Sequence, residues 1–312
     1  MKIRTFLAAL GAAAALVSMP AQAYLYSAIY AFGDSLSDNG QSRTATALGV
    51  APPPASSDGP VAVEFLATAY GVPLYDYAVG GATSGTANTD YASPDPLANS
   101  GVLTQVATFL TDPGVSHGDG AALYVISGGS NDILASADPE ADAAALGASI
   151  AQNLISAVSD LYAAGARHFL LPLLPDIGLS PFALSQGAVA AQGISALIDL
   201  LNSGLSDALS QAFALMPEGT FTIFDTAAAQ RAVISDPAGH GLDNVDAPCL
   251  DDQGAPVLDC KTSFFLDPLH PTSAASLLLA RDIQAALPEP GSMLLAGFAL
   301  VAAVSIRRRA VA

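Results

Sequence analysis

The sequence predicts an α/β fold in which one parallel β-sheet lies between layers of helices. Short apolar stretches typical of buried strands alternate with longer stretches that have helical spacing. The strand-like stretch over residues 168–174 shows little alternation of polar and apolar residues, as expected for a sheet covered on both faces. We find no internal repeat and no interdomain linker, so we expect one domain over residues 24–287.

Five strands are predicted from β-branched and aromatic residues. They cover residues 28–32, 74–79, 121–127, 168–174 and 220–224. Apolar residues at helical spacing predict helices over residues 61–70, 102–110, 140–164, 181–215 and 273–287. Gly71 and Gly165 directly follow two of these helices, at the position where glycine commonly ends a helix. The acidic stretch 225–261 is predicted to be irregular.

The first three strands run into turns rich in small residues. These turns contain residues 33–35, 80–81 and 129–131. The carboxyl ends of parallel strands share one edge of the sheet, where open α/β sheets bind ligands. Ser35 would present a hydroxyl at that edge, and a helix beginning just afterwards would direct its N–H groups toward negative charge. The alternative is an ordinary Asx/Ser turn that caps a helix.

A histidine and a carboxylate late in the chain can activate this serine. A serine hydroxyl becomes a nucleophile when a histidine, itself held by a carboxylate, takes its proton. Of the four histidines we single out His270, which follows Asp267 by three residues across a proline-containing turn. One short loop can present both side chains. By itself, this spacing is also that of a surface turn.

Acyl transfer also needs hydrogen-bond donors for the oxyanion. The candidates are the backbone N–H groups of Ser35 and Gly81 and the side-chain amide of Asn131, each following a predicted strand. Each residue type is also a common turn former, so the prediction depends on their shared edge of the sheet. The sequence leaves open whether Gly80 or Gly81 donates.

Four blocks of sequence carry these candidates. They are Gly33-Asp-Ser-Leu-Ser-Asp-Asn-Gly40, Tyr77-Ala-Val-Gly-Gly-Ala82, Gly129-Ser-Asn-Asp132 and Asp267-Pro-Leu-His-Pro271. In this order and spacing they resemble the conserved blocks of the GDSL, or SGNH, esterase/lipase family, and the resemblance covers nearly all of residues 28–287. It implies a flavodoxin-like three-layer α/β/α sandwich with a mainly parallel five-stranded sheet.

The same resemblance implies a role for each candidate. Ser35 would be the nucleophile, His270 the base and Asp267 the acid that orients it. Ser35, Gly81 and Asn131 would bind the oxyanion. This chemistry needs no metal or cofactor, and the chain has no EF-hand pattern and no glycine-rich phosphate loop followed by lysine.

The N-terminus has the composition of a secretory signal peptide. A basic start, Met1 to Arg4, precedes a nearly all-apolar run to Met19, and Ala21-Gln-Ala23 fits a signal peptidase site. We therefore expect residues 1–23 to be removed. A short N-terminal anchor is the alternative, which the shortness of the apolar run disfavours.

The C-terminus resembles the PEP-CTERM sorting signal of Gram-negative bacteria. Pro288-Glu-Pro290, a mostly apolar run to Ile306 and Arg307 to Arg309 follow in that order. The resemblance, over residues 288–312, implies an exosortase as partner, transient membrane insertion of the apolar helix, and export through the inner membrane to the cell surface, the extracellular matrix or the medium. An ordinary C-terminal membrane anchor is the alternative.

The net charge of the chain restricts the kinds of partner that it can bind. The sequence has 10 basic and 28 acidic residues; five of the basic ones lie in the two end segments, which leaves residues 24–290 with a net charge of −23. A region this acidic repels nucleic acid and anionic membrane surfaces. We expect a monomer whose substrate is neutral or is held by apolar contacts.

Cys249 and Cys260 are the only cysteines. In an oxidising compartment we expect them to form a disulfide, with two free thiols as the alternative. They are too few, and lack the histidine partners, for a zinc site.

Together these features predict an exported serine esterase or lipase that hydrolyses carboxylic esters through an acyl-serine intermediate. Lipid esters, short-chain esters and acetylated polysaccharide all remain possible substrates. Two alternatives use the same fold: an acyltransferase with the same site, and a non-catalytic surface or matrix protein that binds polysaccharide or partners.

Overall fold

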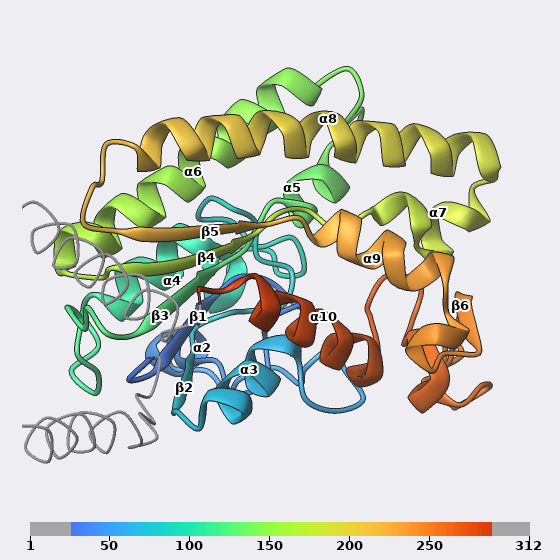
Figure 1. The fold of residues 1–312 in the computed structure, drawn as a ribbon, viewed down its shortest axis with the longest axis horizontal. Coiled ribbons are helices and arrows are strands. Elements are labelled where there is room, and N and C mark those ends of the chain that lie inside the picture. The colour runs from blue at the N-terminus through green and yellow to red at the C-terminus, as the bar shows by residue number, and fades with distance from the viewer. Residues whose placement is uncertain (1–25, 289–312) are drawn as a thin grey trace, which may run out of the picture. The chain divides into compact units, whose positions relative to one another are not determined.

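A five-stranded parallel sheet runs through the centre of the computed structural model, which describes residues 26–288 (Figure 1). The strands are β1 (Ile29–Phe32), β2 (Leu74–Asp76), β3 (Leu123–Ile126), β4 (His168–Pro172) and β5 (Thr220–Phe224). They lie in the order β2-β1-β3-β4-β5, and every neighbouring pair is parallel. This is the flavodoxin-like order, which reverses between β1 and β3. The predicted fold class is confirmed.

The two predicted targeting segments fall almost entirely outside the described residues. The described unit runs from Tyr26 to Pro288. The signal peptide over residues 1–23 and the domain boundaries therefore stay predictions.

Helices cover both faces of the sheet (Figure 1). One face carries α4 (Val102–Phe109), α6 (Ala143–Ala164) and α8 (Ala188–Phe213). The other carries α3 (Ala62–Tyr70) and α10 (Ser273–Ala286). Shorter helices are α2 (Arg43–Ala47), α5 (Ser130–Ala135), α7 (Pro181–Ser185) and α9 (Thr226–Ser235). Single 3₁₀ turns are η1 (Pro96–Asn99), η2 (Ile177–Leu179), η3 (Ala238–His240) and η4 (Cys260–Thr262).

Alternate residues of the central strands supply the two halves of the core. Tyr30 of β1 and Tyr124 of β3 are buried on the side of α4, where both rings pack against Phe109. Val125 points to the opposite face, because successive strand residues alternate, and there it lies near Leu66 of α3. Both faces of the sheet are covered by helices, which explains why the central strands β1, β3 and β4 lack polar alternation.

The predicted helix over residues 181–215 is two helices, α7 and α8. The chain breaks at Gly187, which has a φ of 99°, in the region that favours glycine. Among residues 26–288, α8 is the one helix long and apolar enough to cross a membrane by length and composition. It packs against α6 and buries Leu197, Leu201 and Leu205, as a core helix does. The apolar segment predicted to insert into a membrane lies elsewhere, after residue 288.

The stretch 225–261, predicted to be irregular, contains regular structure. It includes α9 and β6 (Asn244–Pro248), which pairs in parallel with β7 (Ser263–Phe265). The sequence of β6, Asn-Val-Asp-Ala-Pro, is a poor strand former, and its extended form depends on pairing with β7. Local pattern therefore could not predict it.

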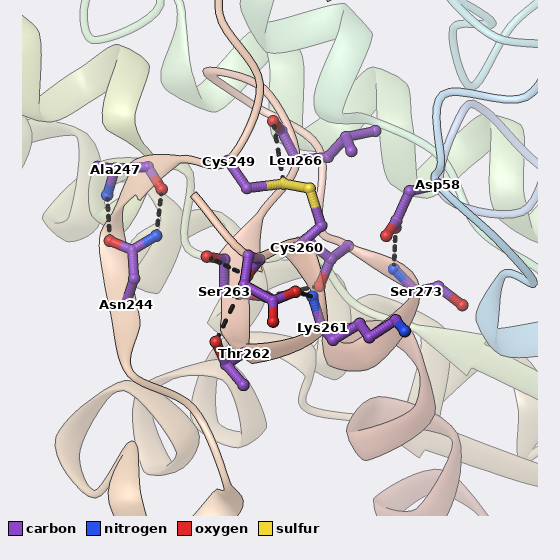
Figure 2. Close-up of a disulfide and its surroundings, with 12 residues drawn as sticks. Asp58, Asn244, Ala247, Cys249, Cys260, Lys261, Thr262, Ser263, Leu266 and Ser273 are labelled. Carbon is purple, nitrogen blue, oxygen red and sulfur yellow. Dashed lines mark hydrogen bonds between the residues drawn. A yellow bond between two sulfur atoms is a disulfide. The ribbon is translucent and has the colours of Figure 1, made fainter. Parts of the chain in front are cut away.

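A disulfide joins Cys249 and Cys260, whose Cα atoms are 5.2 Å apart (Figure 2). The loop that it closes is hydrogen-bonded to the segment just before Asp267. The N–H of Cys249 donates to the carbonyl of Phe265 at 2.9 Å, and the N–H of Leu250 donates to that of Leu266 at 3.0 Å. The disulfide therefore tethers the loop beside the strand that leads to Asp267.

Replacing both cysteines by alanine is expected to lower the free energy of unfolding by about 2–3 kcal/mol, because a closed loop of this size restricts the unfolded chain. Urea unfolding of the oxidised wild type and of the Cys249→Ala/Cys260→Ala variant measures the difference. Reduced wild type is the control and should unfold with the variant. Equal midpoints for oxidised wild type and variant would contradict the prediction.

Candidate active site

A tight turn holds Ser35 at the carboxyl end of β1. Gln105 of α4 bonds both backbone groups of Gly33: its Oε1 accepts from the N–H and its Nε2 donates to the carbonyl, each at 2.8 Å. A Cβ on Gly33 would collide with the hydroxyl of Ser127. The turn closes as the N–H groups of Ser37 and Asp38 donate to the carbonyl of Asp34, both at 3.0 Å. These contacts fix the backbone on both sides of Ser35.

The helix predicted just after Ser35 is absent there, and the prediction was wrong on this point. The next helix, α2, begins at Arg43 with Ser42 as its N-cap. Asp38 and Asn39 instead form side-chain turns to the N–H groups of Gly40 and Gln41, at 2.9 and 3.0 Å. Such turns compete with helix formation. No helix dipole is therefore aimed at Ser35 from this segment.

Three side chains from distant parts of the sequence form a continuous hydrogen-bonded chain. His270 Nε2 lies 2.8 Å from Ser35 Oγ, and His270 Nδ1 lies 2.7 Å from Asp267 Oδ2. The other carboxylate oxygen, Oδ1, accepts the backbone N–H groups of Leu269 and His270 at 2.8 and 2.7 Å. The loop between β7 and α10 thus folds around Asp267, which orients the imidazole toward Ser35.

Asp267 and His270 each stabilise the charged form of the other. Burial opposes the protonated form of His270, but the hydrogen bond and the charge of Asp267 outweigh it, so the pKa of His270 is raised above its ordinary value. Partial burial acts to raise the pKa of Asp267, but the hydrogen bond and the charge of His270 outweigh it, and the pKa is lowered. Asp267 is therefore ionised at neutral pH, as a group that stabilises an imidazolium must be.

The predicted oxyanion donors lie around Ser35 at the same edge of the sheet. Gly81 has a φ of 76°, and the backbone N–H groups of Ser35 and Gly81 have no acceptor among residues 26–288. The N–H of Gly80 is already bound, since it donates to Asp38 Oδ2 at 2.9 Å. Asn131 Nδ2 gives one hydrogen to the carbonyl of Ala82 at 3.0 Å and keeps one free. The geometry favours Gly81 over Gly80 as the donor.

Two buried carboxylates, which the sequence analysis missed, join the Ser35 turn to the glycine turn. Asp38 accepts the N–H groups of Gly40 and Gly80, and Asp76 accepts those of Asn39 and Ala78, all at 2.9 Å. Burial raises the pKa of both carboxyls, that of Asp76 well above its ordinary value, although the N–H bonds oppose this. An aspartate inside the apolar Leu74–Val79 stretch was the available signal for Asp76.

These groups open into a cleft of about 430 Å³. Ser35, Gly81, Asn131 and His270 line it, and Asp267 lies behind His270. Thr89 and Asp90 supply a polar part of the wall, from the long loop after β2. The apolar part is formed by Leu36, Leu134, Ala135, Pro175, Ile177 and Leu269. Residues 26–288 contain no cluster of three or more His, Cys, Asp or Glu side chains able to hold a metal ion.

Comparison with known proteins gives a consistent result. The model of the GDSL-like lipase/acylhydrolase family matches residues 29–283, and that of the PEP-CTERM protein-sorting motif matches residues 286–309. The chain is 31% identical to phosphatidylcholine-sterol acyltransferase of Aeromonas hydrophila, over 78% of this chain and 71% of that protein. It is 30% identical to thermolabile hemolysin of Vibrio parahaemolyticus, over 82% of this chain and only 62% of the hemolysin.

Among solved structures, phospholipase A1 from Streptomyces albidoflavus aligns with 84% of this chain and 100% of its own, at 17% identity and a TM-score of 0.47. The family match covers residues 29–283 of the described residues 26–288 and includes every predicted site residue. The chain therefore belongs to the GDSL-like lipase/acylhydrolase family and carries a PEP-CTERM protein-sorting motif at its C-terminus.

Proposed function

We propose that the protein is an exported serine esterase that hydrolyses carboxylic esters through an acyl-enzyme on Ser35. The observation that carries the proposal is the hydrogen-bonded chain from Ser35 Oγ through His270 to Asp267, which opens into a cleft with unpaired N–H donors. A serine with a histidine base and an ionised carboxylate behind it is the arrangement that nucleophilic acyl transfer requires.

The reaction follows from the positions of these groups. His270 Nε2 takes the proton of Ser35 as Oγ bonds to the ester carbon, and Asp267 stabilises the imidazolium. The carbonyl oxygen becomes negative and binds the N–H groups of Ser35 and Gly81 and the amide of Asn131. The C–O bond to the alcohol breaks as His270 returns its proton to the leaving oxygen. Water, deprotonated by His270, then releases the acid and regenerates Ser35.

The oxyanion assignment can be tested with the two adjacent glycines. A Cβ on Gly81 would collide with Asn88 Oδ1 and Asp90, and the φ of 76° disfavours any side chain. Alanine keeps the N–H, but the collision and the strained φ would shift it away from the oxyanion, so we expect Gly81→Ala to lower kcat about 100-fold or more, as when one donor is lost. Gly80→Ala is the matched control, because its Cβ would lie 3.9 Å from its nearest neighbours. A larger loss in Gly80→Ala than in Gly81→Ala would contradict the assignment.

The basic activity is tested with p-nitrophenyl esters and acetylated polysaccharide, assayed on wild type and Ser35→Ala. The proposal expects hydrolysis by wild type alone. If wild type turns over none of these esters while it binds polysaccharide, the protein is a matrix-binding member of the fold.

An acyltransferase is the second candidate, favoured by the named activity of the Aeromonas relative. Both reactions share the acyl-enzyme and differ in whether water or an alcohol takes the acyl group. Assays with added glycerol or a sterol distinguish them. Constant acid release with no new ester supports hydrolysis, whereas a new ester formed at the expense of acid supports transfer.

The sorting motif indicates export in a Gram-negative bacterium by way of the membrane. We propose that signal peptidase removes residues 1–23 and that an exosortase processes the chain near Pro288, releasing the domain to the cell surface, the matrix or the medium. Intact mass of the exported protein tests this step. Retention of Arg307 to Arg309 in protein from the medium would contradict processing.

A further inference from the structure

A second, smaller pocket adjoins the catalytic cleft. It measures about 70 Å³ and lies among α9, α10 and the segment around β7. Its lining is almost entirely apolar, including Ala229, Val233, Phe264, Ala275 and Leu279. We call this the inner pocket.

The inner pocket and the cleft share three walls: Leu36, Pro175 and Leu269 line both. Leu36 directly follows Ser35, and Leu269 directly precedes His270, so the shared walls begin beside the reacting groups. Both leucines are only half-buried, and a leucine side chain can change rotamer at little cost. These side chains stand between the two spaces, and rotation of either leucine would open an apolar path from Ser35 Oγ into the inner pocket.

The inner pocket also contains an unpartnered polar group. Thr226 is 6% exposed, and its hydroxyl is the one buried side-chain oxygen or nitrogen among residues 26–288 that has no hydrogen-bond partner. The amide of Gln230, also in the lining, is engaged with the backbone of Asp176. A well-packed structural core seldom leaves a hydroxyl unpaired. A hydrocarbon chain in the inner pocket would offer this hydroxyl no partner either, so removing the hydroxyl should favour such a chain.

We propose that the inner pocket receives the acyl chain of the ester, and that its small volume makes the enzyme prefer short acyl groups to long ones. This rests on the proposed function. Hydrocarbon gains free energy by leaving water for an apolar wall, and the inner pocket has a smaller polar share of its lining than the cleft, whose wall includes Thr89 and Asp90. The larger, partly polar cleft holds the alcohol. The small volume of the inner pocket sets the upper limit on chain length.

The first test compares p-nitrophenyl acetate, butyrate, hexanoate and dodecanoate on wild type. We expect kcat/KM to rise at least tenfold from acetate to hexanoate and to fall for dodecanoate. Equal kcat/KM for all four esters would overturn the acyl pocket and leave the esterase proposal standing. Hydrolysis of none would overturn the esterase proposal, and the acyl pocket with it.

Three variants test whether the inner pocket causes the preference for chain length. Ala229→Phe fills the inner pocket and should lower kcat/KM for hexanoate at least tenfold while leaving acetate within about twofold. Ala228→Phe, on the exposed side of the same helix, is the matched control and should change neither. Thr226→Val should raise kcat/KM for hexanoate relative to that for acetate, since it removes the unpaired hydroxyl without changing the shape of the side chain. An unchanged acetate-to-hexanoate ratio in Ala229→Phe would overturn the proposal.

Leu279→Ala tests the same pocket by enlarging it, whereas Ala229→Phe fills it. Leu279 borders both the inner pocket and a neighbouring gap under α3, so its truncation should move the preferred chain length upward by two or more carbons. The same optimum in this variant as in wild type would count against the inner pocket. Thermal melting of each variant identifies any that fails to fold.

Discussion

Ser35→Ala is expected to lower kcat for every ester by about 10⁴-fold or more, with little change in stability. The loss is large because the variant retains the oxyanion donors and the base but has no atom to form the acyl-enzyme. Ser35 is half-exposed at the cleft, and its one side-chain hydrogen bond is to His270. Removing the hydroxyl therefore leaves the fold intact.

Steady-state kinetics and labelling by a fluorophosphonate probe measure this effect together. Ser37→Ala is the matched control: Ser37 lies on the same turn but is buried, with its hydroxyl 3.4 Å from that of Ser127. It should keep both labelling and most of the activity. Labelling that persists in Ser35→Ala and disappears in Ser37→Ala would show that the wrong serine has been assigned.

The fold could be predicted because its signals are local. The five central strands are short runs rich in β-branched and aromatic residues, and the covering helices repeat apolar residues at helical spacing. The β6–β7 pair could not be predicted in this way, because Asp246 and Pro248 make β6 polar and irregular. The expected helix after Ser35 failed for the opposite reason: Asp38 and Asn39 supply local turns that override it.

The sequence could predict which residues form the candidate site, but not which buried groups hold those residues in place. Ser35, Asp267 and His270 follow from the chemistry that a serine nucleophile needs and from their places at strand ends. Asp38 and Asp76 were missed, because what makes them important is a long-range contact between two turns. Their bonds to Gly40 and Ala78 are local turns, but sequence spacing carries no information about the bonds from Asp38 to Gly80 and from Asp76 to Asn39.

Asp267→Asn is expected to lower kcat about 10³-fold, and the structure gives the reason. Asp267 Oδ1 accepts two backbone N–H groups, while Oδ2 faces His270 Nδ1. In the variant the amide oxygen must keep the two N–H bonds, so the NH₂ group faces Nδ1. The imidazole then carries its proton on Nε2 and cannot take one from Ser35. We expect a smaller loss than the roughly 10⁴-fold that follows replacement of a buried triad aspartate by asparagine, because the side chain of Asp267 is 36% exposed.

The pH profile separates this effect from a structural one. The general base must be neutral, so kcat/KM rises with pH through the pKa of His270, which Asp267 holds above its ordinary value. Removing the carboxylate lowers that pKa. The residual kcat/KM of Asp267→Asn should therefore begin to fall at a lower pH than the kcat/KM of wild type does. Asp90→Asn is the control: Asp90 raises the His270 pKa only through space, so the shift should be small. A variant with reduced kcat and an unmoved acid limb would mean that Asp267 supports the loop without acting on the base.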